Sequence, residues 1–465
     1  MSMSSSFVCP KVTETMPETK LTTASSRETR VDMISNLPDT ILHLILSRLP
    51  STDEAIRTSI LSTRWRYLWT SVHSLNLDWS SKLKPYAKFS KTKFKKFVYS
   101  VLLNKAQNFD SLRLCCLDYY NMSTVRRWIQ AASMRKVKSL DLMFCAKAIH
   151  DRFERTDRYE VIVLPCCLFT CDSLESLRLF LYRRPLSLPR CNGFPALRVL
   201  ELNSVHCFDH DFIERLLEIC PLLQKLSLID SLIRTLDAVY ITCPKLKTLR
   251  VFNWNNLLHG SEGLCGCVTV SCPELVSFEY VGPRGHFIFE KVDSLKKAVI
   301  LPEDMLQEEI SCELGDTCID AARDLKSSFP AFFPNLKTLE LTTTIDAFTL
   351  NVLIRIIRCS PNLESLHLII QKELIKPENW ELDEVETWRI LTRHLKRVEF
   401  LEFNVENQKL DIVRLLLKHG NVLREMVLSW RNKVEYNENS AETMNVVSKF
   451  YKAASTVKLT ALLKN

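Results

Sequence analysis

Apolar residues recur with two different spacings along this chain, and the first spacing is that of a helix. Between residues 37 and 50, apolar positions recur every three or four residues, which is the spacing of one face of a helix. These positions are Ile41, Leu42, Ile45, Leu46 and Leu49. Pro38 suits the first turn of such a helix, and Pro50 ends it because proline lacks the N–H that a helix interior needs.

Two shorter helices are predicted after this first one. Ser51 or Thr52 can cap the first of them, and the two acidic residues that follow favour its positive end. The segment Arg64–Trp69 is the second. A unit of about 40 residues is too short to bury its own apolar face comfortably. The apolar stripe therefore indicates that a partner covers it.

From residue 171 onward, the second spacing comes from a repeated sequence motif. Seven segments share one pattern. A Cys, Phe or Ser is followed by Pro or Asp, then by any residue, then by leucine, and further apolar residues come after the leucine. They begin at Cys171, Phe194, Cys220, Cys243, Cys272, Phe333 and Ser360, with separations of 23, 26, 23, 29, 61 and 27 residues. The longest gap holds a weaker copy at residues 293–298, and degenerate copies surround Leu395 and Leu423. Periods in the twenties are typical of leucine-rich repeats.

Each repeat is expected to be a strand, a turn and a helix. Residues 197–202 nearly alternate between apolar and polar, as in a strand with one buried face. Residues 209–219 carry apolar residues at helical spacing with Asp209 as the expected cap, and similar helices are expected at 348–357 and 410–417. No single unit can bury both faces, so neighbours should stack into a curved α/β solenoid. The Cys or Phe before each proline should fill its core.

The N-terminal helical unit closely resembles the plant F-box signature. The matching segments are LPDTILHLILSRLP at residues 37–50 and SILSTRWRYLW at residues 59–69. Later segments are similar to the plant F-box/leucine-rich-repeat family with a C-terminal FBD region. Residues 125–142 look like its first repeat, and residues 395–426 look like its FBD region.

The expected organisation follows from the repeat, the resemblance and the polar composition of the first residues. It comprises a disordered leader (1–30), a three-helix F-box (31–75), a leucine-rich-repeat solenoid (76–390), FBD-like repeats (391–455) and a tail (456–465).

The resemblance implies a role in which this chain performs no catalysis. In that family the F-box docks on a Skp-type adaptor, which joins a cullin and a RING subunit, and the solenoid presents a target protein for ubiquitin transfer. The chain is thus expected to be a substrate-recognition subunit with no cofactor; the alternative is a leucine-rich-repeat interaction scaffold outside any ligase. The residues expected to bind the adaptor are Leu37, Pro38, Ile41, Leu42, Ile45, Leu49, Pro50, Trp65 and Leu68.

The net charge of +8 is spread along the chain except for one basic stretch. Seven lysines lie between Lys82 and Lys96, interleaved with aromatic residues that include Phe94 and Phe97. One interpretation is a nucleic-acid-binding surface. The favoured interpretation is a solvated helix or loop whose aromatic residues point inward, because no nucleic-acid motif accompanies the lysines. Nucleic acid is therefore not the expected partner.

The 17 cysteines are expected to be reduced. Residues 1–30 lack the apolar segment of a secretory signal, and no apolar run reaches the ~18 residues of a membrane span. We therefore expect no membrane partner and a location in the nucleus or cytoplasm. Cys265, Cys267 and Cys272 are the best zinc candidates, but they lack the CxxC spacing and a well-placed second pair. They are expected to be buried hydrophobic residues instead.

Other groups that could carry chemistry have simpler explanations. His206 and His210 lie near Asp209 and Asp211 at a helix start, where Asp is a routine cap. The pair Cys166–Cys167 lies in an apolar run, which indicates core rather than a reactive thiol. No metal or catalytic site is therefore predicted. The sequence does not identify target-binding residues, and the long insertions at 253–266 and 302–330 are the candidates.

Overall fold

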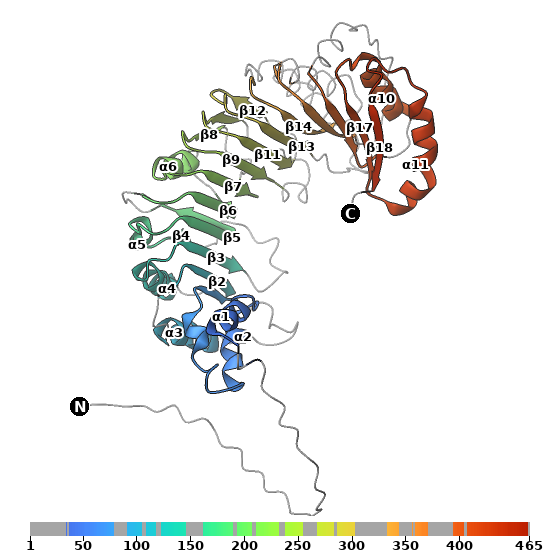
Figure 1. The fold of residues 1–465 in the computed structure, drawn as a ribbon. Coiled ribbons are helices and arrows are strands. Elements are labelled where there is room, and N and C mark those ends of the chain that lie inside the picture. Colours follow the sequence, from blue (N-terminus) through green and yellow to red (C-terminus); the bar gives the residue numbers. More distant parts are fainter. Residues whose placement is uncertain are drawn as a thin grey trace, which may run out of the picture.

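The computed structural model describes residue 34, residue 356 and the ranges 37–78, 91–104, 108–117, 122–145, 161–188, 193–206, 211–231, 238–253, 267–282, 286–302, 333–343, 359–370, 394–403 and 407–463. Within them the chain is an α/β protein built on one large parallel sheet, which confirms the α/β part of the predicted fold class. In Figure 1 the strands follow one another in chain order along an arc, from β1 near the first helices to β18 beside α11.

The large sheet grows by one strand per repeat. Fifteen described strands belong to it, and each pairs in parallel with its neighbour. In order of pairing they are β1 (Ser74–Leu77), β2 (Ser111–Leu117), β3 (Ser139–Cys145), β5 (Ser176–Ser187), β6 (Val199–His206), β7 (Lys225–Ile229), β9 (Thr248–Phe252), β11 (Ser277–Gly282), β13 (Lys297–Pro302), β14 (Thr338–Thr343), β15 (Ser365–Ile370), β16 (Arg397–Leu401), β17 (Glu425–Trp430) and β18 (Lys458–Leu463), with β4 (Ile162–Val163) beside β5.

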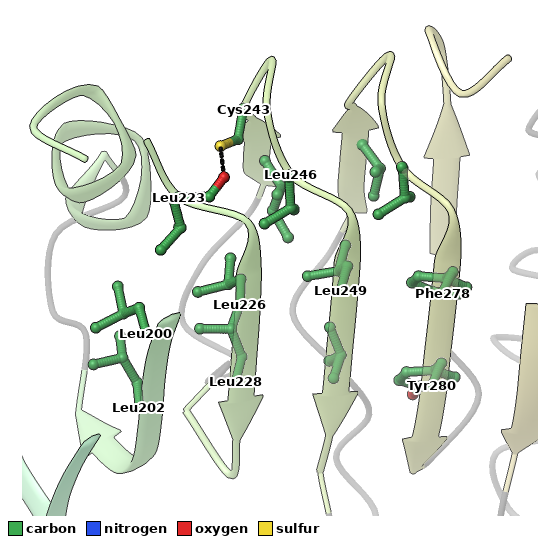
Figure 2. Packing of buried hydrophobic residues seen from close by; sticks show 14 of the residues in the cluster. Leu200, Leu202, Leu223, Leu226, Leu228, Cys243, Leu246, Leu249, Phe278 and Tyr280 are labelled. Atoms are coloured by element: carbon green, nitrogen blue, oxygen red, sulfur yellow. Dashed lines mark hydrogen bonds between the residues drawn. The ribbon is translucent and has the colours of Figure 1, made fainter. Parts of the chain in front are cut away.

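The repeat fixes the register of this sheet. The second residue of one strand pairs with the second residue of the next, as Leu200 does with Leu226, and Leu226 with Leu249. Because alternate residues of a strand point to opposite faces, these leucines line one face in a row. Figure 2 shows them on adjacent strands, and each is at most 1% exposed. This face is the continuous hydrophobic core of the array.

The cysteines that precede the repeat prolines fill the same core. Cys220, Cys243 and Cys272 are buried, and burial raises the pKa of the Cys220 and Cys272 thiols to about 12. The Cys243 thiol donates a hydrogen bond to the Leu223 carbonyl at 3.7 Å (Figure 2). These thiols therefore behave as small buried hydrophobic groups, as the sequence predicts.

Helices connect the strands in several of the described repeats. The described ones are α3 (Lys91–Asn104), α4 (Met122–Met134), α5 (Cys166–Phe169), α6 (Phe212–Glu218), α10 (Asn407–His419) and α11 (Lys433–Ser448). Helices α6 and α10 lie where the sequence predicts helices, although α6 begins after Asp211 rather than Asp209. The predicted leader, and all of the helix predicted at 348–357 except Ile356, lie outside the described residues.

The middle repeats differ from the predicted strand, turn and helix. A second parallel sheet, of order β12-β10-β8, follows the large sheet there, with β8 (Ala238–Thr242) packed against α6. Its other strands are β10 (Cys267–Ser271) and β12 (His286–Phe289). The segments AVYIT, CVTVS and HFIF are rich in β-branched and aromatic residues, which favour strands over helices. The prediction of a helix in every repeat is therefore wrong.

The C-terminal segment also differs from its prediction. Residues 456–465 were expected to be a tail, but β18 lies within them and pairs with β17 from Glu425↔Lys458 to Trp430↔Leu463. Helix α11 packs against β18 and places Val447 in the main core. The last strand is therefore part of the sheet, because its alternating residues extend the same register.

Candidate functional site

The N-terminal unit is built from two α-helices and two 3-10 helices. These are α1 (Asp39–Ser47), α2 (Thr52–Arg57), η1 (Thr58–Ile60) and η2 (Leu68–Ser71). Pro38 precedes the first turn of α1, and the Ser51 side chain accepts a hydrogen bond from the Glu54 backbone N–H at 3.4 Å. Both observations confirm the predicted starts of these helices.

The third helix predicted at Arg64–Trp69 is not formed. Residues 63–67 are turns, and η2 begins only at Leu68. The bonds that hold this segment span three residues: Leu68 N–H donates to the Trp65 carbonyl at 3.3 Å, and Thr70 N–H to the Tyr67 carbonyl at 3.0 Å. This segment therefore has the tighter 3-10 geometry that is common in short connecting pieces.

This unit has a small core of its own. Its buried members are Leu42, Leu46, Ala55, Trp65, Leu68 and Val72, and Leu37, Leu49 and Trp69 pack against them. The Asp39 carboxylate accepts a hydrogen bond from Arg64 at 2.5 Å, joining α1 to the turns that follow η1. The core is separate from the main core of the sheet, so the unit is a distinct small domain.

The small domain is fixed to the first strand of the sheet. The Asn76 backbone N–H donates to the Thr52 hydroxyl at 2.8 Å, and the Asn76 side chain donates to the Pro50 carbonyl at 2.6 Å. These bonds satisfy polar groups at the edge strand β1, which would otherwise stay unpaired. The domain therefore caps the N-terminal end of the sheet.

Between the start of α1 and the end of η2, six large apolar side chains remain on the surface of this domain. Their exposed fractions run from 37% at Ile45 to 88% at Ile60. We call these residues the apolar surface: Ile41, Leu44, Ile45, Ile60, Leu61 and Tyr67. Exposed apolar groups gathered in one short segment mark an interaction site more often than a structural one.

The structure separates the predicted adaptor-binding residues into three groups. Pro38, Ile41, Ile45 and Pro50 are exposed, Leu37 and Leu49 are partly buried, and Leu42, Trp65 and Leu68 are buried in the small core. The buried three can shape a binding surface, but only the exposed ones can touch a partner without rearrangement. No observation yet tests their contact with an adaptor, so that assignment stays a prediction.

Sequence reasoning missed part of the apolar surface. Leu44, Ile60, Leu61 and Tyr67 were not among the predicted adaptor-binding residues. The spacing of Leu44 from Ile41 was a usable signal, since residues three apart share a helix face. The exposure of Ile60 had no such signal, because it follows from the 3-10 turn of η1.

In the described part of the basic stretch, Phe94 and Phe97 pack against the main core. Phe94 is fully buried and packs edge-on against Trp128 with ring centroids 6.2 Å apart. Lys93, Lys95 and Lys96 are exposed on the same helix. This part of the stretch is the solvated helix face that the sequence favoured, while residues 81–90 lie outside the described residues.

The predicted metal and thiol candidates do not converge within the described ranges. Cys265, Asp209 and His210 lie outside those ranges, and no group of three or more His, Cys, Asp or Glu residues within them could hold a metal ion. Burial raises the pKa of the partly buried Cys167 thiol, so it is a poor nucleophile. In the same part of the chain, no helix is both long and apolar enough to cross a membrane.

A polar network on β15 and β16 was not predicted. The Ser365 hydroxyl and His367 Nε2 lie 2.9 Å apart, His367 Nδ1 lies 3.2 Å from Glu399 Oε2, and Ser429 donates to Glu399 Oε1 at 2.8 Å. The order of groups is that of a catalytic triad. However, the Ser365 N–H already bonds the Lys337 carbonyl at 2.9 Å, so it cannot stabilise an oxyanion. The network instead satisfies the buried Glu399 carboxylate.

Comparisons with known proteins agree with the two-part architecture. An F-box domain model matches residues 34–77, and a model of the leucine-rich repeats of the FBD-associated F-box protein At5g56370 matches residues 125–368, just over half of the chain. The chain is 28% identical to the putative FBD-associated F-box protein At5g56560 of Arabidopsis thaliana, over 90% of this chain and 97% of that protein.

Two further Arabidopsis thaliana relatives give the same picture. The F-box/FBD/LRR-repeat protein At5g56420 is 27% identical over 86% of this chain and 91% of its own length. The putative F-box/FBD/LRR-repeat protein At2g05300 is 34% identical over 44% of this chain and 42% of its own length. The small helical domain, the parallel repeat sheet and these matches together place the chain in the plant F-box family with leucine-rich repeats and an FBD region.

Proposed function

We propose that this chain is the substrate-recognition subunit of a Skp-cullin-F-box ubiquitin ligase. The F-box would dock on a Skp-type adaptor, the adaptor would join a cullin and a RING subunit, and the curved repeat solenoid would bind a target protein. The single observation that supports this most is the apolar surface, which stays exposed although the small domain already has a closed core. F-box proteins in general act as such receptors, which agrees with the match to residues 34–77.

The apolar surface has the character of a docking site. Its members lie on α1, at the end of η1 and in the turn before η2, and they are aliphatic or aromatic, as at the centres of strong interfaces. Because the small domain is tied to β1 through Asn76, an adaptor bound there would hold a defined position relative to the sheet. The geometry therefore suits a subunit that links a ligase to a target.

The catalytic step would lie on the partner subunits. Within the described residues, the best nucleophile-like arrangement is the Ser365 network, which lacks a free N–H at Ser365 for an oxyanion. The chain would therefore contribute binding and orientation, since holding two reactants together is itself a large part of catalysis.

Charged substitutions in the apolar surface test the proposal. The triple variant I41D, L44D and I60D changes exposed side chains, so the fold should survive. Loss of one central anchor costs ~2 kcal/mol, or about 30-fold in affinity, so the triple variant should abolish adaptor capture. The matched control is Val434→Asp, which changes an equally exposed apolar residue on α11 far along the chain.

The measurement is capture of a Skp-type adaptor by purified full-length chain, followed by addition of cullin. Capture by the wild type and the control, and its loss in the triple variant, support the proposal. Adaptor capture by the triple variant at wild-type affinity would contradict the site. Adaptor binding without recruitment of cullin would favour the alternative, a leucine-rich-repeat scaffold outside any ligase.

A further inference from the structure

One backbone contact recurs at the start of almost every strand. In most repeats, the N–H groups of the residue before a strand and of its first residue both donate to the carbonyl of the equivalent residue one repeat earlier. Lys247 N–H and Thr248 N–H, for example, bond the Gln224 carbonyl at 2.8 and 3.0 Å. The residues before the strands therefore lie in a row along one edge of the sheet, about 4.8 Å apart.

The middle of this row is basic. The six consecutive positions from β6 to β14 are Arg198, Gln224, Lys247, Val276, Lys296 and Lys337, which include four cations and no acid. All four cationic side chains are exposed, and none forms an ion pair with a described residue. We call these four cations the basic ridge. Five steps of one strand each give it a length of about 24 Å.

Several charges elsewhere on the sheet are paired with neighbours. On the polar face, Arg178 lies 3.6 Å from Glu201, and Arg250 lies 2.9 Å from Glu279 on the adjacent strand. Flanking the ridge in the same row, Lys138 pairs with Asp110 at 3.0 Å.

On the other flank Lys396 pairs with Glu364 at 3.2 Å, and this pairing lowers the pKa of the Glu364 carboxyl. The row thus places an acid at each end of the ridge, Glu175 beside Arg198 and Glu364 beside Lys337, but omits acids from its centre. An anionic partner would supply the missing charges.

An extended polypeptide fits the ridge better than a nucleic acid. The ridge has no aromatic member, whereas proteins that hold single-stranded nucleic acids combine cations with aromatic stacking surfaces. Glu274 and Asp293, on the turns before Val276 and Lys296, are also exposed and would repel a continuous line of phosphates. A peptide can place carboxylates beside the cations and neutral residues beside these two acids.

We propose that the basic ridge binds an acidic segment of the protein that this chain presents for ubiquitin transfer. This inference rests on the proposed ligase function and names the chemical class of its target. The binding would be electrostatic, so it should weaken steeply with salt, because the Debye length falls from about 30 Å at 0.01 M to 8 Å at 0.15 M ionic strength.

The experiment compares two variants with equal changes in charge. The ridge variant is K247E, K296E and K337E. The control is K93E, K95E and K96E, which reverses three exposed cations on α3 and also tests the basic stretch considered as a nucleic-acid surface. Fluorescence anisotropy measures binding of a labelled peptide of alternating glutamate and serine residues to each full-length protein at low and physiological salt, with labelled oligouridine RNA as the competing class.

The ridge variant should bind the glutamate-serine peptide at least ~10-fold more weakly at low salt, since several rim charges act together, and the control should stay within about twofold of the wild type. Equal loss in both variants, or no binding by the wild type, would overturn the ridge. Tighter binding of RNA that depends on the ridge would also overturn it. Capture of the Skp-type adaptor is measured in parallel for the wild type and the ridge variant. If the wild type does not capture the adaptor, the ligase function is refuted, whatever the peptide-binding result for the ridge.

Discussion

The alternation of buried and exposed residues along each strand can be tested within β9. Leu249 is fully buried between Leu226 and Phe278, and its neighbour Arg250 points to the polar face, where it pairs with Glu279 at 2.9 Å. Leu249→Ala removes about three buried carbons, each contributing ~0.8 kcal/mol. A cavity term adds to this, so the total loss of stability should be about 3 kcal/mol.

Arg250→Ala should cost far less, because the guanidinium is about half exposed and exposed ion pairs contribute ~0.2–1 kcal/mol. The assay is urea denaturation of both variants followed by far-UV circular dichroism. The urea concentration at the midpoint of the first unfolding transition should fall several times further for Leu249→Ala than for Arg250→Ala. Equal shifts, or a larger shift for Arg250→Ala, would refute the assignment of faces.

Three further predictions concern a turn, two thiols and a helix cap. Gly193→Ala should lower stability by more than ~1 kcal/mol, measured by thermal unfolding, because φ is +99° and a Cβ atom would lie 2.4 Å from the Ile219 carbonyl oxygen. Since burial raises the pKa of Cys220 and Cys272 from 9.0 to about 12, their contribution to stability is complete below pH 9 and falls as pH rises toward 12. Between pH 8 and pH 10.5, the melting temperature of the double variant Cys220→Ala and Cys272→Ala should fall less than that of the wild type. Parallel curves of melting temperature against pH would contradict this. Asn432→Ala removes the cap of α11 and should cost ~1 kcal/mol by thermal unfolding; an unchanged melting temperature would contradict the cap.

The parts of the fold that depend on local pattern could be predicted from the sequence. The helical period at residues 41–49 located α1, and the recurring leucines located strands of the repeats, such as β6 at Val199–His206. The second sheet could not be predicted from the repeat consensus, because β8, β10 and β12 lie in its variable half. Their β-branched residues favour strands, but the prediction followed the regular order of strand, turn and helix and placed helices there.

The binding features were harder to predict because they depend on spacing in three dimensions. The four cations of the basic ridge are 41 to 49 residues apart in sequence, and only stacking of the repeats brings them into one row. The apolar surface was predicted in part, but burial of Leu42, Trp65 and Leu68 depends on how the turns after η1 fold back. In both cases the missing information was tertiary.

Co-elution of this chain with a Skp-type adaptor and a cullin tests the proposed function most directly. The three purified proteins are mixed and passed over a size-exclusion column, and the composition of each peak is measured. One peak that holds all three in equal amounts is expected, because the apolar surface of the F-box should be covered by the adaptor. Elution of the chain by itself, with adaptor and cullin together in another peak, would contradict the role assigned to that surface.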